Sequence, residues 1–266
     1  MLSLSQLLLP LVALTASGLT LFSGFGLGTI LMPAFAIFFP VEVAVAATGV
    51  VHLANNLFKL ALLGRRADWG VVARFALPGA LAAIAGAWLL TALAHFPAIG
   101  SYTLAGSTFQ VSLVKLVLGA LIAAFAVLEL APSLEARIRL DKRHLPLGGA
   151  LSGFFGGLSG HQGALRSAVL LKCGLGKEAF ITTGVVCAVV VDVTRLATYG
   201  VAFFLDHFQS IKEAGGLGIV ALTTLAAFAG AFMGTRLMKK VTMRAVQIIV
   251  GGLLLLVALG LMGGLI

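Results

Sequence analysis

Three long segments without any charged residue constrain the fold of this chain more than any other feature. No Asp, Glu, Lys or Arg occurs in residues 1–41, 75–114 or 245–266. A helix needs about 20 apolar residues to cross the hydrocarbon core of a bilayer, and each of these segments is long enough. The whole chain is 60% hydrophobic and 10% charged, and a soluble domain could not cover so much apolar surface with so few polar side chains. The sequence therefore predicts an all-α polytopic membrane protein.

The apolar residues form a series of blocks in which the second half of the chain echoes the first. Thr-Gly-Val-Val at 48–51 recurs at 183–186, and Asn-x-x-Lys-Leu-Ala at 56–61 corresponds to Asp-x-x-Arg-Leu-Ala at 192–197, at an offset of about 136 residues. This constant offset predicts two repeats, 1–134 and 146–266, joined by a basic linker, 135–145. The predicted segments are 4–39, 41–63, 72–97 and 108–131 in the first repeat, and 146–175, 178–204, 215–236 and 244–266 in the second.

The basic residues predict how these segments are oriented in the membrane. The stretches 65–74, 137–143 and 236–244 hold 11 of the 18 Lys and Arg residues, and short loops rich in these residues stay in the cytoplasm. One such loop follows the second segment of the first repeat, whereas another follows the third segment of the second repeat. The two repeats are therefore predicted to have opposite orientations, with both termini outside. A parallel repeat with one misplaced basic loop is the alternative.

Opposite orientations require each repeat to cross the membrane an odd number of times. The first segment of each repeat is longer than one span, and glycines interrupt it at 23–28 and at 153–163. We therefore predict that 4–39 and 146–175 are broken, re-entrant hairpins whose tips lie inside the membrane, and that three transmembrane helices follow each of them. Such irregular backbone is tolerated where protein or a water-filled cavity surrounds it.

The two predicted tips are candidates for a substrate site. Paired interrupted helices in inverted-repeat transporters mark where substrate binds, and the N-terminus of each second half-helix attracts anions. Arg166 lies one turn into the second of these helices, and an intramembrane arginine is a functional candidate. The candidate substrate ligands are Ser23, Gly24, Phe25, Gly26, Thr48, Asn55, Asn56, Ser159, Gly160, His161, Gln162, Gly163, Arg166, Thr183 and Arg195.

These residues also have structural interpretations that the sequence leaves open. The glycines of the tips can serve close helix packing, and Arg166 can extend its guanidinium to the cytoplasmic surface. Asp192 and Arg195 are three residues apart and can neutralise each other. Alternatively, Asp192 and His161 are candidates for proton coupling, since a histidine titrates near neutral pH.

Other classes of partner are less compatible with the sequence. The formal net charge of +9 arises mainly from residues in short loops, so nucleic acid is not an expected partner. Cys173 and Cys187 lack the spacing of metal ligands, and we expect no metal site, no cofactor and no enzymatic activity. The expected partners are a small anion and the lipid bilayer, with a homodimer left open.

Several short motifs resemble one known membrane family. Ser-Gly-x-Gly-x-Gly at 23–28 is followed by Pro33, by Pro-x-Glu at 40–42 and by Ala-Asp-Trp at 67–69, and the second half contains Gly-Leu-Gly-Lys-Glu-Ala at 174–179. This pattern, which covers nearly the whole chain, resembles the TauE/SafE sulfite exporter family. The resemblance implies a bacterial inner-membrane exporter or permease whose cargo is a small sulfur-containing anion, such as sulfite or an organosulfonate. The second tip departs from the glycine-rich form of many members, because it carries His161, Gln162 and Arg166.

The favoured hypothesis is a secondary transporter in which the two tips bind the anion near the centre of the bilayer. Alternating access would come from one repeat rocking against the other. Two alternatives remain: an anion channel, and a membrane-embedded phosphatase of the undecaprenyl pyrophosphate type. The phosphatase would need carboxylates at the tips, and neither tip contains Asp or Glu.

Overall fold

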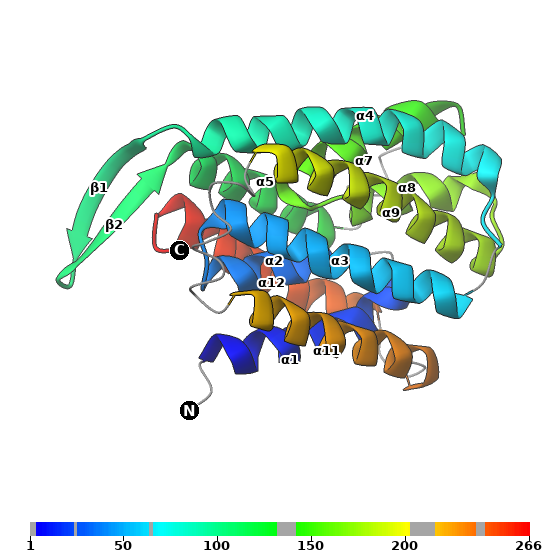
Figure 1. The fold of residues 1–266 in the computed structure, drawn as a ribbon, viewed down its shortest axis with the longest axis horizontal. Coiled ribbons are helices and arrows are strands. Elements are labelled where there is room, and N and C mark those ends of the chain that lie inside the picture. The colour runs from blue at the N-terminus through cyan, green and yellow to red at the C-terminus, as the bar shows by residue number, and fades with distance from the viewer. Residues whose placement is uncertain (1–3, 24–25, 64–65, 132–141, 203–215, 238–242) are drawn as a thin grey trace.

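The protein is a bundle of helices that lie roughly along one direction (Figure 1). A computed structural model describes residues 4–23, 26–63, 66–131, 142–202, 216–237 and 243–266. Its helices are α1 (Leu4–Ser23), α2 (Leu27–Ala36), α3 (Val41–Leu63), α4 (Trp69–Ala94), α5 (Leu113–Leu130), α7 (Leu145–Ser159), α8 (Gly163–Leu170), α9 (Lys177–Ala202), α11 (Gly216–Leu237) and α12 (Met243–Met262), with short 3-10 turns at Lys142–His144 and Leu171–Cys173.

The helical content and apolar character confirm the prediction of an all-α polytopic membrane protein. Within the described residues, four helical stretches are long and apolar enough to cross a membrane: Val41–Leu62, Trp69–Ala94, Lys177–Gly200 and Gly216–Gly234. Residues 135–141 of the predicted linker lie outside the described residues. α1 begins and α12 ends at the same end of the bundle, and α3 ends and α4 begins at the opposite end (Figure 1). Which end faces outside stays a prediction.

A small β-hairpin is the feature that the sequence analysis did not predict. Strand β1 (Ala98–Leu104) pairs antiparallel with β2 (Ser107–Ser112), so the predicted helix 108–131 begins too early. The turn uses Ala105 at φ 50° and Gly106 at φ 81°, a backbone conformation that suits a two-residue hairpin. Threonine, tyrosine, phenylalanine and valine in these strands favour extended structure. The hairpin projects from one end of the bundle, and its Tyr102 hydroxyl donates to the Gly263 carbonyl at 2.5 Å.

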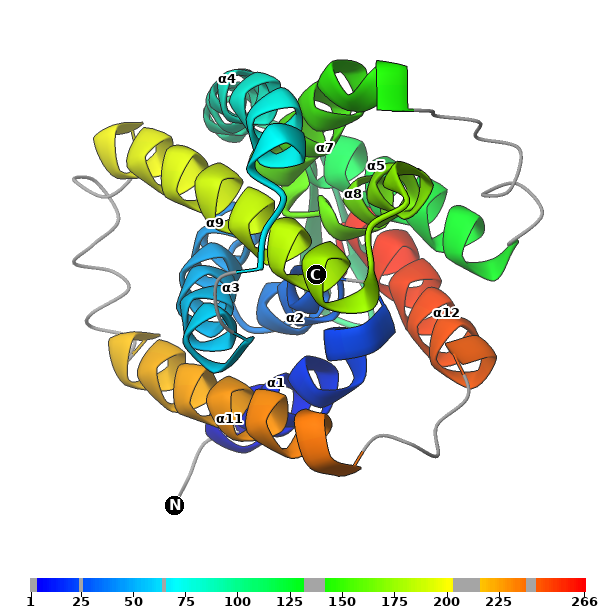
Figure 2. The same cartoon turned by 90° about the vertical axis from the view of Figure 1, so that its right-hand side faces the viewer.

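Both predicted hairpins contain a break between two helices. α1 and α2 are separated by residues 24–26, and α7 and α8 by residues 160–162. Gly160 ends α7 with a φ of 80°, a left-handed conformation that glycine adopts without strain. α2 has 10 residues and α8 has 8, so at about 1.5 Å per residue neither could cross a core about 30 Å thick. α2 lies near the centre of the bundle (Figure 2), where nearly all of its residues are buried.

Helices of the two halves pack in pairs, and the duplication itself stays a prediction. α4 of the first half packs against α7 of the second, and α11 of the second half packs correspondingly against α1 of the first. α3 packs against α9, and α5 against α12. Each of these contacts thus has a counterpart in which the two halves exchange roles, as a two-fold repeat requires. The inverted orientation of the repeats in the membrane stays a prediction.

Glycines allow α4 and α7, and likewise α1 and α11, to approach until their backbones are in contact. A Cβ atom at Gly153 in α7 would lie 1.9 Å from the Gly79 carbonyl oxygen in α4, and one at Gly230 in α11 would lie 2.0 Å from the Leu14 carbonyl oxygen in α1. Neither neighbour can yield, because each is backbone. Close approach of this kind increases van der Waals contact between helices in lipid.

We predict that Gly153→Ala lowers the midpoint of thermal unfolding of the detergent-purified protein, by an amount equivalent to about 1–3 kcal/mol, because the added methyl forces α4 and α7 apart. The matched control is Gly252→Ala in α12, where a Cβ would meet no atom within 4 Å. There alanine should leave the midpoint unchanged or raise it, since alanine favours helix over glycine. Equal effects of the two substitutions would contradict the packing described here.

Candidate substrate site

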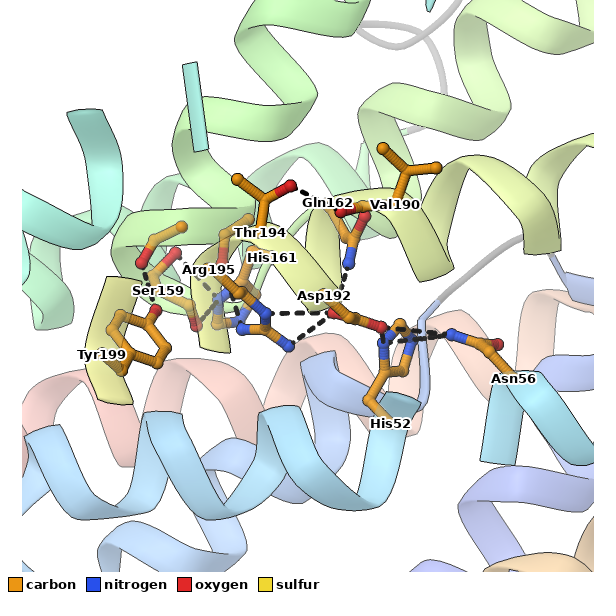
Figure 3. A network of polar contacts seen from close by, with 12 residues as sticks. His52, Asn56, Ser159, His161, Gln162, Val190, Asp192, Thr194, Arg195 and Tyr199 are labelled. Atoms are coloured by element: carbon orange, nitrogen blue, oxygen red, sulfur yellow. Dashed lines mark hydrogen bonds and ion pairs between the residues drawn. The ribbon is translucent and has the colours of Figure 1, made fainter. Parts of the chain in front are cut away.

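A buried carboxylate, Asp192 of α9, is the centre of a polar network between three elements (Figure 3). The Asp192 side chain is fully buried. Its Oδ2 lies 2.6 Å from Nδ1 of His52 on α3, and its Oδ1 accepts from Nε2 of Gln162, in the α7–α8 break, at 2.9 Å. Nε of Arg195 donates to Oδ1 at 3.0 Å. These partners compensate a charge that would otherwise be very costly inside a membrane.

Arg195 ties this network to α7. The Arg195 side chain is fully buried, and one of its terminal nitrogens lies 2.9 Å from Asp192 Oδ1. Another terminal nitrogen donates to the Gly156 carbonyl at 3.1 Å, and the Tyr199 hydroxyl donates to the neighbouring Gly157 carbonyl. The mutual neutralisation considered for Asp192 and Arg195 is therefore present in the structure.

A cavity of about 50 Å³ lies beside this network, and two cations line it. Arg166 of α8 and Lys59 of α3 are 8% and 6% exposed, and His52 and Asn56 also line the cavity. Among the residues that the structure describes, no carboxylate lines it. The remaining lining residues are Thr20, Gly26, Leu27, Ser167, Leu170, Phe180, Ile181, Gly184 and Val185. A small cavity with buried cations and without acidic residues suits an anion.

Neutral groups hold the two cations in place. A terminal nitrogen of Arg166 donates to Gln162 Oε1 at 3.2 Å, and the same Gln162 binds Asp192. With the Asn55 amide oriented to satisfy its neighbours, its oxygen accepts from Lys59 Nζ at 3.3 Å and its nitrogen donates to the Ala227 carbonyl at 3.2 Å. Across the described part of the chain, neither Lys59 nor Arg166 forms an ion pair with a carboxylate.

The two helix breaks lie next to each other, and the first of them borders the cavity. A Cβ at Gly26, the residue before α2, would lie 3.6 Å from His52 Nε2 and 3.8 Å from Gly163 Cα. A Cβ at Gly28 would lie 3.2 Å from the Gly160 carbonyl oxygen. The start of α2, with the N–H groups of its first turn, thus borders the cavity, and such groups favour negative charge.

The structure brings only some of the predicted ligands to this cavity. Gly26, Asn56 and Arg166 line it. Gln162 and Arg195 belong instead to the Asp192 network. Ser23 is the last residue of α1, and its side chain is not described; Gly24 and Phe25 lie outside the described residues.

The other predicted ligands Thr48, Asn55 and Thr183 do not line the cavity. Thr48 is buried beside Gly28, and Asn55 pairs with the Ser17 hydroxyl at 3.1 Å. The Thr183 hydroxyl accepts from the Asp68 N–H at 2.9 Å, near the start of α4.

In the second tip, His161 contacts neighbouring protein groups and not the cavity. His161 Nδ1 lies 3.0 Å from the Ser159 carbonyl oxygen, and its ring stacks on Phe125 at 5.4 Å between centroids. Neither Ser159 nor His161 lines the cavity, and neither do Gly160 and Gly163. The roles assigned to these residues from the sequence stay predictions.

Two residues that the sequence analysis left out of the predicted ligands, His52 and Lys59, line the cavity. They lie with Asn56 at positions i, i+4 and i+7 of α3, a spacing that places all three on one helix face. This periodicity of polar residues within an apolar helix was the signal available in the sequence.

A comparison with known protein families identifies the family to which the chain belongs. The sequence model described as "Sulfite exporter TauE/SafE" matches residues 9–261. The protein belongs to the TauE/SafE sulfite exporter family. The predicted resemblance is thereby confirmed over nearly the whole chain, and this TauE/SafE protein is a multi-pass membrane protein of a transporter family. Neither the curated proteins nor the solved structures contain a match to it.

We predict that Asp192→Asn destabilises this TauE/SafE protein by about 3–5 kcal/mol, because it leaves the buried Arg195 without its counter-charge. The measurement is the thermal unfolding midpoint of the detergent-purified protein. The control is Glu178→Gln, since Glu178 and its partner Arg66 are 67% and 74% exposed and exposed pairs contribute about 0–1 kcal/mol. An unfolding midpoint of Asp192→Asn equal to that of Glu178→Gln would argue against a structural role for the network.

Proposed function

We propose that this protein exports a small sulfur-containing anion, sulfite or an organosulfonate, and binds it in the cavity beside His52. The observation that carries this proposal is the cavity lining: Lys59 and Arg166 are both buried there, and no carboxylate of the described residues accompanies them. Membership in the sulfite exporter family supports the choice of cargo. We propose the bacterial inner membrane as the location, with both termini outside.

The cavity offers different kinds of donor to different parts of such an anion. Arg166 presents a planar guanidinium that can donate two parallel hydrogen bonds to an oxyanion, whereas Lys59 supplies a compact charge. The Asn56 amide and the N–H groups at the start of α2 add neutral donors. Phe180, Ile181 and Leu170 form an apolar wall, which excludes water and strengthens these contacts.

Transport would proceed by alternating access around this site. The helix breaks come from opposite halves of the chain, and movement of one half against the other would expose the cavity first to one side and then to the other. An inside-negative potential favours export of an anion by about 2.3 kcal/mol per charge per 100 mV. Transport driven by this potential alone is therefore physically sufficient.

We propose that protons coupled to transport would pass between Asp192 and the cavity through His52. His52 contacts Asp192 through Nδ1 and also lines the cavity, whereas Asp192 does not. His161, the other predicted coupling residue, stacks on Phe125 away from the cavity. We therefore add His52 to Asp192 as the pair through which a proton would pass.

The two alternative functions have less support. The phosphatase requires carboxylates, and none lines the cavity among the described residues. An anion channel would use the same cations, and single-channel conductance in planar bilayers distinguishes it from a carrier.

We predict that Arg166→Ala lowers sulfite efflux from proteoliposomes by about tenfold or more, since a charge-assisted hydrogen bond contributes about 1.5–3 kcal/mol. Arg166→Lys should retain part of the activity, because it keeps the charge but loses the planar pair of donors. Lys172→Gln is the control, because Lys172 is an exposed cation close to α8 in the sequence. Normal efflux by Arg166→Ala would exclude this cavity as the binding site.

Proton coupling by the proposed route makes a separate prediction for His52. When a proton leaves together with the anion, export of sulfoacetate, which does not titrate near neutral pH, makes the interior of wild-type proteoliposomes more alkaline, as an enclosed pH dye reports. His52→Gln should abolish this pH change while potential-driven export continues, and the exposed His95→Gln should preserve it. An unchanged pH signal in His52→Gln would remove His52 from the route.

A further inference from the structure

Asn56 occupies the position at which the second repeat carries a carboxylate. Asn56-x-x-Lys59 in α3 corresponds to Asp192-x-x-Arg195 in α9, and the two helices pack against each other. Asn56 Nδ2 lies 3.4 Å from Asp192 Oδ2. In α9 the carboxylate neutralises the arginine three residues later at 2.9 Å. In α3 the amide at the same position cannot neutralise Lys59.

This substitution leaves two positive charges at the cavity. Asp192 and Arg195 form a neutral pair, and His52 contacts the same carboxylate. Lys59 and Arg166 both line the same small cavity, so their two positive charges face the same space. Asp192 attracts Arg166, but its charge is already matched by Arg195. Two like charges in a buried site raise its energy until a counter-charge enters.

We infer that the cavity selects doubly charged oxyanions over singly charged ones, and that Asn56 determines this selectivity by leaving Lys59 for the substrate to neutralise. The bound anion takes the place of the carboxylate that α9 has and α3 lacks. This inference rests on the proposed function, and it adds the charge state of the cargo and a residue that sets it.

A pair of tetrahedral anions of similar size tests the selectivity. Sulfate carries two negative charges and methanesulfonate carries one. We expect sulfate to compete with radiolabelled sulfite for the purified wild-type protein at a concentration about tenfold lower than methanesulfonate requires, at a mildly alkaline pH where sulfite is mainly doubly charged. With labelled sulfite bound, equal competition by the two anions, including none by either, would overturn the inference.

Asn56→Asp tests the role of the residue itself. The new carboxylate should pair with Lys59, weaken sulfite binding about tenfold or more, and reduce the preference for sulfate over methanesulfonate. Position 56 also lies 3.4 Å from Asp192 Oδ2, so the unfolding midpoint of Asn56→Asp without ligand is measured beside its affinity to separate weakened binding from misfolding. Asn56→Ala controls for the lost amide and should keep the preference. Retention of wild-type sulfite affinity by Asn56→Asp would contradict the inference.

Lys59→Met supplies a second variant that removes the charge and keeps the length of the side chain. It should bind sulfate and methanesulfonate with nearly equal affinity, and a preserved preference would overturn the inference. A wild-type protein that binds none of the three anions and does not transport sulfite would overturn the proposed function instead. The two failures are therefore distinguishable.

Discussion

The ion pair between Asp192 and Arg195 is the interaction on which the centre of this bundle depends. A carboxylate and a guanidinium can remain charged inside an apolar bundle only when each satisfies the other and the remaining polar atoms find partners. Asp192 meets these conditions by binding His52 on α3 and Gln162 in the α7–α8 break, while Arg195 reaches the Gly156 carbonyl on α7. The same contacts that neutralise the pair therefore also hold α3, α9 and the broken helix in fixed relation.

The cations at the cavity differ from this neutral pair, because no carboxylate of the described residues neutralises them. Gln162 contacts both Asp192 and Arg166, so it joins the compensated charges to an uncompensated one. Lys59 and Arg166 are buried at the cavity, and no carboxylate of the described residues forms an ion pair with either of them. The start of α2 borders the same cavity. The proposal that an anion binds in this cavity agrees with the membership of the chain in the sulfite exporter family.

The sequence analysis was most successful where hydropathy and local chemistry decide the outcome. Hydropathy indicated the all-α membrane class, and glycines indicated the interruptions, although the second break is confined to residues 160–162 rather than extending from Gly153. Gly153 serves instead in packing against α4. The β-hairpin was not predicted, because residues 95–112 are as free of charge as the helices around them and hydropathy alone does not separate strand from helix.

Sequence by itself determined the membrane class, the family and the helix breaks, since each follows from composition or spacing, and it marked Arg166 as a candidate because a buried arginine is costly wherever it lies. The tertiary structure decided which polar residues meet. It placed Arg195 and Asp192 in a neutral network and brought Lys59 and His52 of α3 to the same cavity as Arg166 of α8. The physical reason is that the partners of a buried charge can lie far apart in the sequence, as His52 and Asp192 do at 140 residues, and only the packing of α3 against α9 and the broken helices brings them within hydrogen-bonding distance.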